Sequence, residues 1–80
     1  MDRAEIQGKH LLVFGGGFDS GAKILIDGEV HQKTSNDDLN PTGILFGKKA
    51  GKKIAAGQTV ILQARNSDGT LSNQLRFTRP

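Results

Sequence analysis

Short stretches of alternating apolar and polar residues run along the whole chain, separated by segments rich in glycine and aspartate. No apolar pattern with the helical period of 3.6 residues persists over the roughly 10 to 12 residues that a helix needs. The period is two residues, as in a pleated strand whose side chains alternate between faces. The pattern therefore predicts strands. They are expected at Ala4–Gln7 (short), Lys9–Phe14, Ala22–Asp27, Glu29–Thr34, Gly43–Lys49, Thr59–Arg65 and Ser72–Arg79.

Turn sequences separate these strands. Asp27-Gly28 favours a two-residue hairpin turn, because both central positions of a type I′ turn need a positive φ angle. Ser35–Thr42 is polar and contains a proline, and Asn66–Thr70 is a cluster of turn-forming residues, so both are expected to be loops. Six or seven short strands joined in this way predict an all-β protein. The expected architecture is an antiparallel β-sandwich, formed by a single domain over residues 1–80.

Alternation within each strand assigns its side chains to two faces. The expected core set is Leu11, Val13, Ile24, Ile26, Ile44, Phe46, Val60, Leu62, Leu75 and Phe77. The opposite faces also carry large apolar side chains, and a contiguous exposed patch of this kind marks an interface. The expected protein interface consists of Leu12, Phe14, Leu25, Leu45 and Ile61. Two alternatives stay open, because a strand shifted by one residue exchanges its faces and the N-terminal segment can cover some of these side chains.

Positive charge is concentrated in one segment. The formal net charge is +3, and four of the 11 lysines and arginines lie within Gly47–Lys53. Lysines that neutralise phosphates dominate the non-specific affinity for nucleic acids. A short lysine cluster is also a common solvated feature that discourages pairing of sheet edges. An alternative function is therefore the binding of a polyanion, either a nucleic acid or an acidic polysaccharide. Its residues would be Lys48, Lys49, Lys52 and Lys53, with Arg65 and Arg76 as helpers.

The segment Phe14–Lys23, FGGGFDSGAK, has the composition of a phosphate-binding loop. Such a loop, GxxxxGK[ST], leads from a strand into a helix whose N-terminus meets the phosphates. Here an alanine stands where the lysine is required, and the following AKILIDGE predicts a strand and a tight turn. We therefore expect a bend with positive φ angles at some glycines, and Phe18 closing the end of the sandwich.

Candidate catalytic and metal-binding residues are sparse. Cysteine is absent, which excludes disulfides and thiolate chemistry, and without Trp and Tyr there is little on which a sugar ring could stack. His10 and His31 fall on different strands without partners at ligand spacing, and both are expected to face solvent. The acidic clusters Asn36–Asp38 and Asn66–Gly69 lack the DxDxDG pattern of calcium loops. We therefore expect them to form Asx turns, and calcium binding stays an alternative. The sequence predicts no enzyme activity, cofactor, metal or small-molecule substrate.

Two groups of motifs give the chain a resemblance to a known family. Leu11-x-Val13-x-Gly15-Gly16-Gly17-Phe18 is followed by Ala22-Lys23-Ile24-x-Ile26-x-Gly28, then by Gly57-x-x-Val60-x-Leu62-x-Ala64-x-Asn66-x-x-Gly69-x-x-Ser72-Asn73 and Leu75-x-Phe77. From about Lys9 to Arg79 this succession is similar to the immunoglobulin-like IPT/TIG domains. The chain departs from the family in two places. Only DRAEIQG stands where members usually have a proline-bearing strand, and Leu12 and Phe14 occupy positions that are usually polar.

The resemblance implies an immunoglobulin-like sandwich of about seven short strands with a non-catalytic structural or protein-interaction role. Such modules often occur in bacterial surface or secreted proteins, and similar ones in transcription factors bind DNA or dimerise. Fold alone does not choose among these roles. The chain shows no signal peptide and no apolar run of about 18 residues, so an extracellular or cell-surface location implies a piece excised from a larger protein. The expected partner is a neighbouring domain, another protein or a second copy of the chain.

Overall fold

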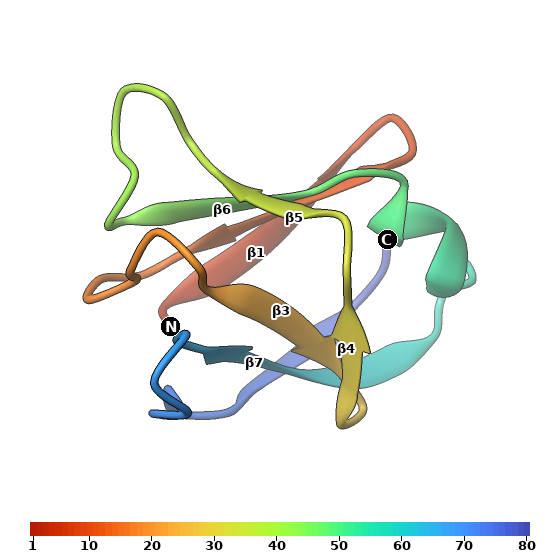
Figure 1. The fold of residues 1–80 in the computed structure, drawn as a ribbon. Coiled ribbons are helices and arrows are strands. Elements are labelled where there is room, and N and C mark those ends of the chain that lie inside the picture. Colours follow the sequence, from red (N-terminus) through yellow and green to blue (C-terminus); the bar gives the residue numbers. More distant parts are fainter.

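Eight strands and one short 3₁₀ helix make up the fold in the computed structural model, which describes residues 1–80. Sheet A has the strand order β1-β2-β6-β5 and sheet B the order β4-β3-β7-β8, and every pairing is antiparallel. Figure 1 shows sheet A above sheet B. The predicted antiparallel β-sandwich is confirmed. Its elements are β1 (Arg3–Gln7), β2 (His10–Phe14), β3 (Lys23–Ile26), β4 (Glu29–His31), β5 (Thr34–Asn36), β6 (Ile44–Gly47), η1 (Ala50–Lys53), β7 (Thr59–Arg65) and β8 (Leu75–Thr78).

Local turn chemistry behaves as the sequence predicts. Asp27 and Gly28 have φ angles of 50° and 84°, and they join β3 to β4 with Ile26 opposite Glu29. Gly17 adopts a φ of 74°, which glycine tolerates because it has no Cβ. The next residue, Phe18, is 3% exposed and belongs to the core. Strand β3 follows this bend instead of a helix, so the predicted bend leading into a strand is confirmed.

The segment after the Asp27-Gly28 turn crosses from one sheet to the other. Strand β4 pairs with β3 in sheet B, whereas β5 pairs with β6 in sheet A. The predicted single strand Glu29–Thr34 is therefore two short strands, and the first residues of the predicted Ser35–Thr42 loop belong to β5. Thr34 holds the crossing, because its hydroxyl donates to the His31 carbonyl oxygen and accepts from the Ile24 N–H at 3.2 Å.

The core lies between the sheets and contains most of the predicted set. Leu11, Val13, Ile24, Ile26, Val60 and Leu62 are buried, and the half-buried Leu75 and Phe77 pack against the core. The prediction for β6 is wrong. Leu45 is fully buried, whereas Ile44 and Phe46 point outward and are half-buried. The register places Leu45 opposite Val13, and directly opposed residues share one face of a sheet.

The connections gather at two ends of the sandwich. Gly15–Ala22 and Asn66–Gln74 lie at one end, near the N-terminus (Figure 1). Helix η1, the turn between β1 and β2, and the C-terminus lie at the other end, which we call the lysine end. No helix has the length and apolar character needed to cross a membrane. The lysine end and the outer face of sheet A are the two places where the fold positions candidate binding residues.

Candidate functional site

The five residues predicted to form one protein interface do not share a surface. Leu12 and Phe14 lie half-buried on the outer face of sheet A. Leu25 and Ile61 lie on the outer face of sheet B, where Leu25 is only 6% exposed and Ile61 37% exposed. Leu45 belongs to the core. The prediction of a single five-residue patch is therefore wrong, because the outer faces of two packed sheets point in opposite directions.

The outer face of sheet A nevertheless carries a continuous group of apolar side chains. Leu12 stands opposite Phe46, and Phe14 stands opposite Ile44, across the β2–β6 pairing. The two pairs are adjacent on one face because their members are two residues apart along each strand. All four side chains are half-buried. We call Leu12, Phe14, Ile44 and Phe46 the apolar strip.

Charged and polar side chains border the apolar strip. The Arg3 guanidinium lies 3.9 Å from the centroid of the Phe14 ring, a cation–π contact. Glu5, which stands opposite Leu12, accepts from Arg3 at 3.3 Å. The rings of His10 and Phe46 have centroids 4.9 Å apart. The border thus carries both signs of charge beside an apolar centre.

A second candidate surface lies at the lysine end, where β6 leads into η1. Lys48 and Lys49 follow β6, and all four lysines of the predicted cluster are exposed. The structure adds Lys33 from the β4–β5 crossing, because the Lys48 N–H donates to the Lys33 carbonyl oxygen at 2.9 Å. A groove of about 320 Å³ opens there, which we call the basic groove. It is lined by Lys33, Lys48, Lys49 and Lys53, together with Val30, His31 and Gln32.

The basic groove has no neutralising carboxylate. No aspartate or glutamate lines it, and the only ion pair in the chain joins Arg3 and Glu5. Asp27 and Glu29 line a second hollow, which shares Lys53 with the groove. The lysine ammonium groups therefore repel one another, and only Lys53 shares a hollow with carboxylates. An anionic ligand would relieve this repulsion.

His31 lies beneath the lysines and is buried, so the prediction that it faces solvent is wrong. It stands opposite Ile24, whose face of β3 points into the core. Its Nε2 lies 2.9 Å from the Lys48 carbonyl oxygen and donates to it. The neutral ring then leaves Nδ1 unprotonated, and this buried atom has no hydrogen-bond partner. Burial lowers the pKa of His31, since the imidazolium would lose its water, and the charges of Lys53 and Lys33 lower it further.

The two arginines predicted to help the lysines do not line the basic groove. Arg65 and Arg76 are exposed on strands β7 and β8 of sheet B, and β7 runs away from η1 toward the opposite end (Figure 1). A third arginine has a structural role that its sequence context did not indicate. The Arg79 guanidinium donates to the carbonyl oxygens of Gly51 and Ile54, at 2.7 Å for the latter. Arg79 thereby holds η1, and the lysines on it, in place.

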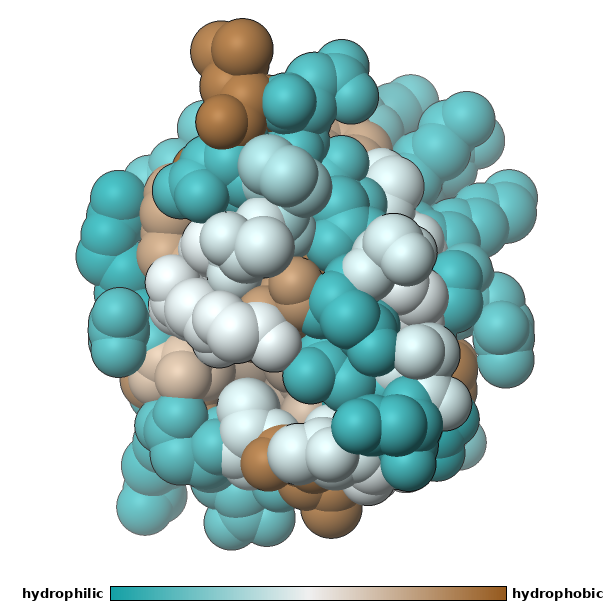
Figure 2. Space-filling view, turned by 60° about the vertical axis from the view of Figure 1, so that its left-hand side comes forward, coloured by the Kyte–Doolittle hydropathy of each residue, from teal (hydrophilic) through white to brown (hydrophobic).

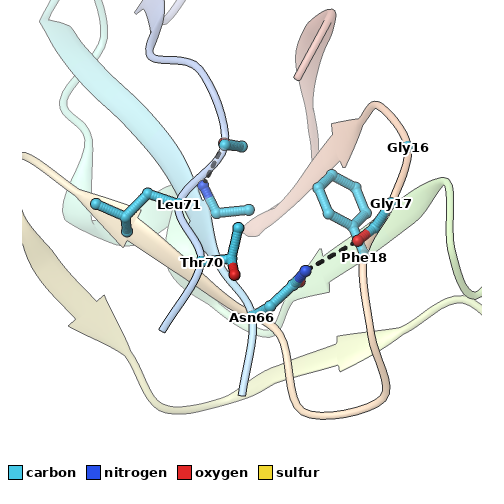
Figure 3. A pocket seen from close by; sticks show the side chains of 8 residues that line it. Gly16, Gly17, Phe18, Asn66, Thr70 and Leu71 are labelled. Atoms are coloured by element: carbon cyan, nitrogen blue, oxygen red, sulfur yellow. Dashed lines mark hydrogen bonds between the residues drawn. The ribbon is translucent and has the colours of Figure 1, made fainter. Parts of the chain in front are cut away.

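The glycine-rich bend and the Asn66–Thr70 turn meet in a small hollow at the other end of the molecule (Figure 3). The Asn66 side-chain amide donates to the Gly17 carbonyl oxygen at 2.9 Å, and Phe18 forms part of the lining. The hollow measures about 160 Å³, below the roughly 300 Å³ at which ligand pockets begin. No charged residue lines it. The hydrogen bond from Asn66 to Gly17 joins two motifs on which the family resemblance rests, so we assign it a structural role.

The same end shows little continuous apolar surface. Figure 2 shows apolar residues there as separate brown patches among polar and weakly polar ones. Leu39 and Leu71 are 96% and 53% exposed. Single exposed leucines are common on protein surfaces, so they do not define an interface.

The acidic loops are occupied by hydrogen bonds within the chain. Asp37 accepts from the N–H groups of Leu39 and Asn40, and Asp68 accepts from the Thr70 N–H at 2.9 Å, so the predicted Asx turns are confirmed. Asp19 accepts from the Ser67 hydroxyl at 2.7 Å, and this bond is the main reason that its pKa is lowered. No group of three or more acidic or histidine side chains is placed to hold a metal ion.

No protein-family model, curated protein or solved structure matches the chain. Its fold defines it as a small antiparallel β-sandwich. Its candidate binding surfaces are the apolar strip on sheet A and the basic groove at the lysine end.

Proposed function

We propose that this chain is a non-catalytic protein-interaction module, the role that its resemblance to the IPT/TIG domains implies. The observation that supports the proposal is the apolar strip, in which two adjacent cross-strand pairs place four large apolar side chains on one outer sheet face. A contiguous apolar patch with a polar border is typical of protein interfaces. On this proposal the module belongs to a larger bacterial surface or secreted protein.

The partner that we propose for the apolar strip is a second copy of the chain. A two-fold contact requires a surface that is complementary to itself. The strip offers an apolar centre, and its border carries Arg3 and Glu5, which have opposite charges. Two copies packed face to face can place strip against strip while Arg3 of one copy meets Glu5 of the other. Sheets commonly pack in this way, about 10 Å apart.

Sedimentation velocity over a range of protein concentrations tests this proposal. We expect the sedimentation coefficient of the wild-type chain to rise with concentration, and that of Phe14→Ser to stay at the monomer value. Leu39→Ser is the matched control, since it removes an exposed apolar side chain that does not belong to the apolar strip, and it should behave like wild type. Circular dichroism verifies that each variant is folded.

Two results would overturn the proposal. A wild-type chain that remains a monomer at every concentration excludes self-association. A dimer that persists unchanged in both Phe14→Ser and Phe46→Ser places the contact elsewhere on the molecule.

A further inference from the structure

We propose that the basic groove binds a linear acidic polysaccharide, whose sulfate or carboxylate groups pair with Lys33, Lys48, Lys49 and Lys53. This inference is independent of the proposed dimer contact, because it rests on different residues. Its starting point is the density of positive charge, since the groove gathers four exposed lysines and no carboxylate. A ligand with regularly repeated anionic groups can engage several of them at once.

The backbone at the groove is held in place before any ligand binds. The Lys48 N–H donates to the Lys33 carbonyl oxygen at 2.9 Å, which ties the two lining segments together. The Lys49 N–H donates to Nδ1 of His10 at 3.0 Å, and Lys49 itself adopts a left-handed φ of 60°. The lysine stems therefore project from fixed positions. Binding then costs mainly the ordering of the side chains, because the main chain is already ordered.

The chemistry of the lining favours a polysaccharide over a nucleic acid. Single-stranded nucleic acids are usually held by aromatic side chains on which bases stack, and the only ring in the lining is the buried His31. Readers of duplex bases rely on arginine, and no arginine lines the groove. The exposed amide of Gln32, by contrast, offers both a donor and an acceptor to a sugar hydroxyl. The groove thus offers charge and hydrogen bonds without a surface for bases.

Heparin serves as the probe, with neutral dextran, single-stranded DNA and duplex DNA as comparison ligands. The test variant is Lys33→Gln/Lys48→Gln. The matched control is Arg65→Gln/Arg76→Gln, which removes the same two charges outside the groove. All four side chains are exposed, so both variants should fold, and circular dichroism verifies this. Affinity is measured by calorimetry at several salt concentrations, since pairing with a polyanion weakens as salt rises.

We expect wild type to bind heparin in a salt-dependent manner and not to bind dextran. The groove variant should bind heparin about tenfold more weakly and with a shallower salt dependence. Binding through fewer charge contacts releases fewer counterions. The heparin affinity of the control variant should stay within about twofold of the wild-type value. NMR supplies a second readout, in which heparin should shift the signals of His31, Gln32 and Lys33 more than those of Arg65 and Arg76.

Three results would overturn the inference. Equal weakening in the groove and control variants would show that net charge alone drives binding. Tighter binding of either DNA than of heparin at the same salt concentration would assign the groove to nucleic acid. An absence of heparin binding at low salt would show that the basic groove does not bind an acidic polysaccharide.

Discussion

The buried, neutral ring of His31 is a property that the sequence of its own strand does not predict. Its Nε2 donates to the Lys48 carbonyl oxygen, and its buried Nδ1 has no partner. A proton on Nδ1 would create a buried donor without an acceptor, close to the positive charges of Lys33 and Lys53. The native structure therefore favours the neutral ring.

This environment predicts a pH dependence of stability. The unfolded chain takes up the proton of His31 near its ordinary pKa of 6.5, whereas the folded chain does so only at lower pH because its pKa is lowered. The unfolded state then binds more protons, so the free energy of unfolding decreases as the pH falls below about 6.5. The stabilisation is fully present above that pH and is lost as the pH falls through the folded pKa.

Urea denaturation at about pH 7.5 and 5.5 measures the effect, at values high enough to keep the aspartates ionised. His31→Gln should show a smaller loss of stability on acidification than wild type. His10→Gln is the control and should keep the His31 contribution. If wild type and His31→Gln lose the same stability on acidification, His31 does not carry the effect.

At the scale of elements, β6 shows where alternation reaches its limit. Ile44, Leu45 and Phe46 are three consecutive apolar residues, so either phase of the strand would bury an apolar side chain. Pairing with β2 decides between them, because Val13 points into the core and Leu45 stands opposite it. The fully buried Leu45 is therefore worth more to stability than Ile44, although the two side chains contain the same number of carbon atoms.

Substitution of each residue by alanine tests the phase of β6. Leu45→Ala should lower the free energy of unfolding by about 2–5 kcal/mol, since it removes buried methyl groups and leaves a cavity. Ile44→Ala should cost distinctly less, because its side chain already contacts water. Urea denaturation gives both values, with Leu45→Val as a milder variant in case the alanine variant does not fold. A cost for Ile44→Ala that equals or exceeds that of Leu45→Ala would contradict the observed register.

At the scale of the whole molecule, one carboxylate joins loops that are far apart in the sequence. Asp19 accepts from the N–H and hydroxyl of Ser67, 48 residues away, at 2.9 and 2.7 Å. The Asn36 side chain donates to the Asp19 carbonyl oxygen at 2.8 Å, which brings in strand β5. The Gly15–Ala22 loop is thus tied to both sheets. We call these bonds the Asp19 clamp.

Loss of the Asp19 clamp should lower thermal stability. Asp19→Asn removes the charge that strengthens the bonds from Ser67, so we expect a lower melting midpoint at neutral pH. The lowered pKa of Asp19 means that this stabilisation is present above the ordinary value of 3.8 and is lost as the pH falls through the folded pKa. Circular dichroism melts at about pH 7 and 3 should therefore show a smaller difference between wild type and variant at the lower pH. Asp38→Asn, at an exposed aspartate, is the control. An unchanged midpoint in Asp19→Asn at neutral pH would show that the clamp does not contribute.

The sequence by itself determined the features that depend on neighbours along the chain. These are the positions of most strands, the Asp27-Gly28 turn, the bend closed by Phe18, and the lysine cluster around η1. The positive φ demands of a tight turn and the two-residue period of a strand are local, so residue types reveal them.

Only the tertiary structure decided which surfaces these elements form. The structure divided the predicted interface between two sheets and turned Leu45 inward. It also buried His31. At the lysine cluster it added Lys33 and left Arg65 and Arg76 outside the groove. Each outcome depends on which sheet a strand joins, on strand register or on the crossing from β4 to β5. Register is set by pairing between residues remote in the sequence, and a shift of one residue exchanges the two faces of a strand. A pattern read along a single strand therefore cannot supply that information.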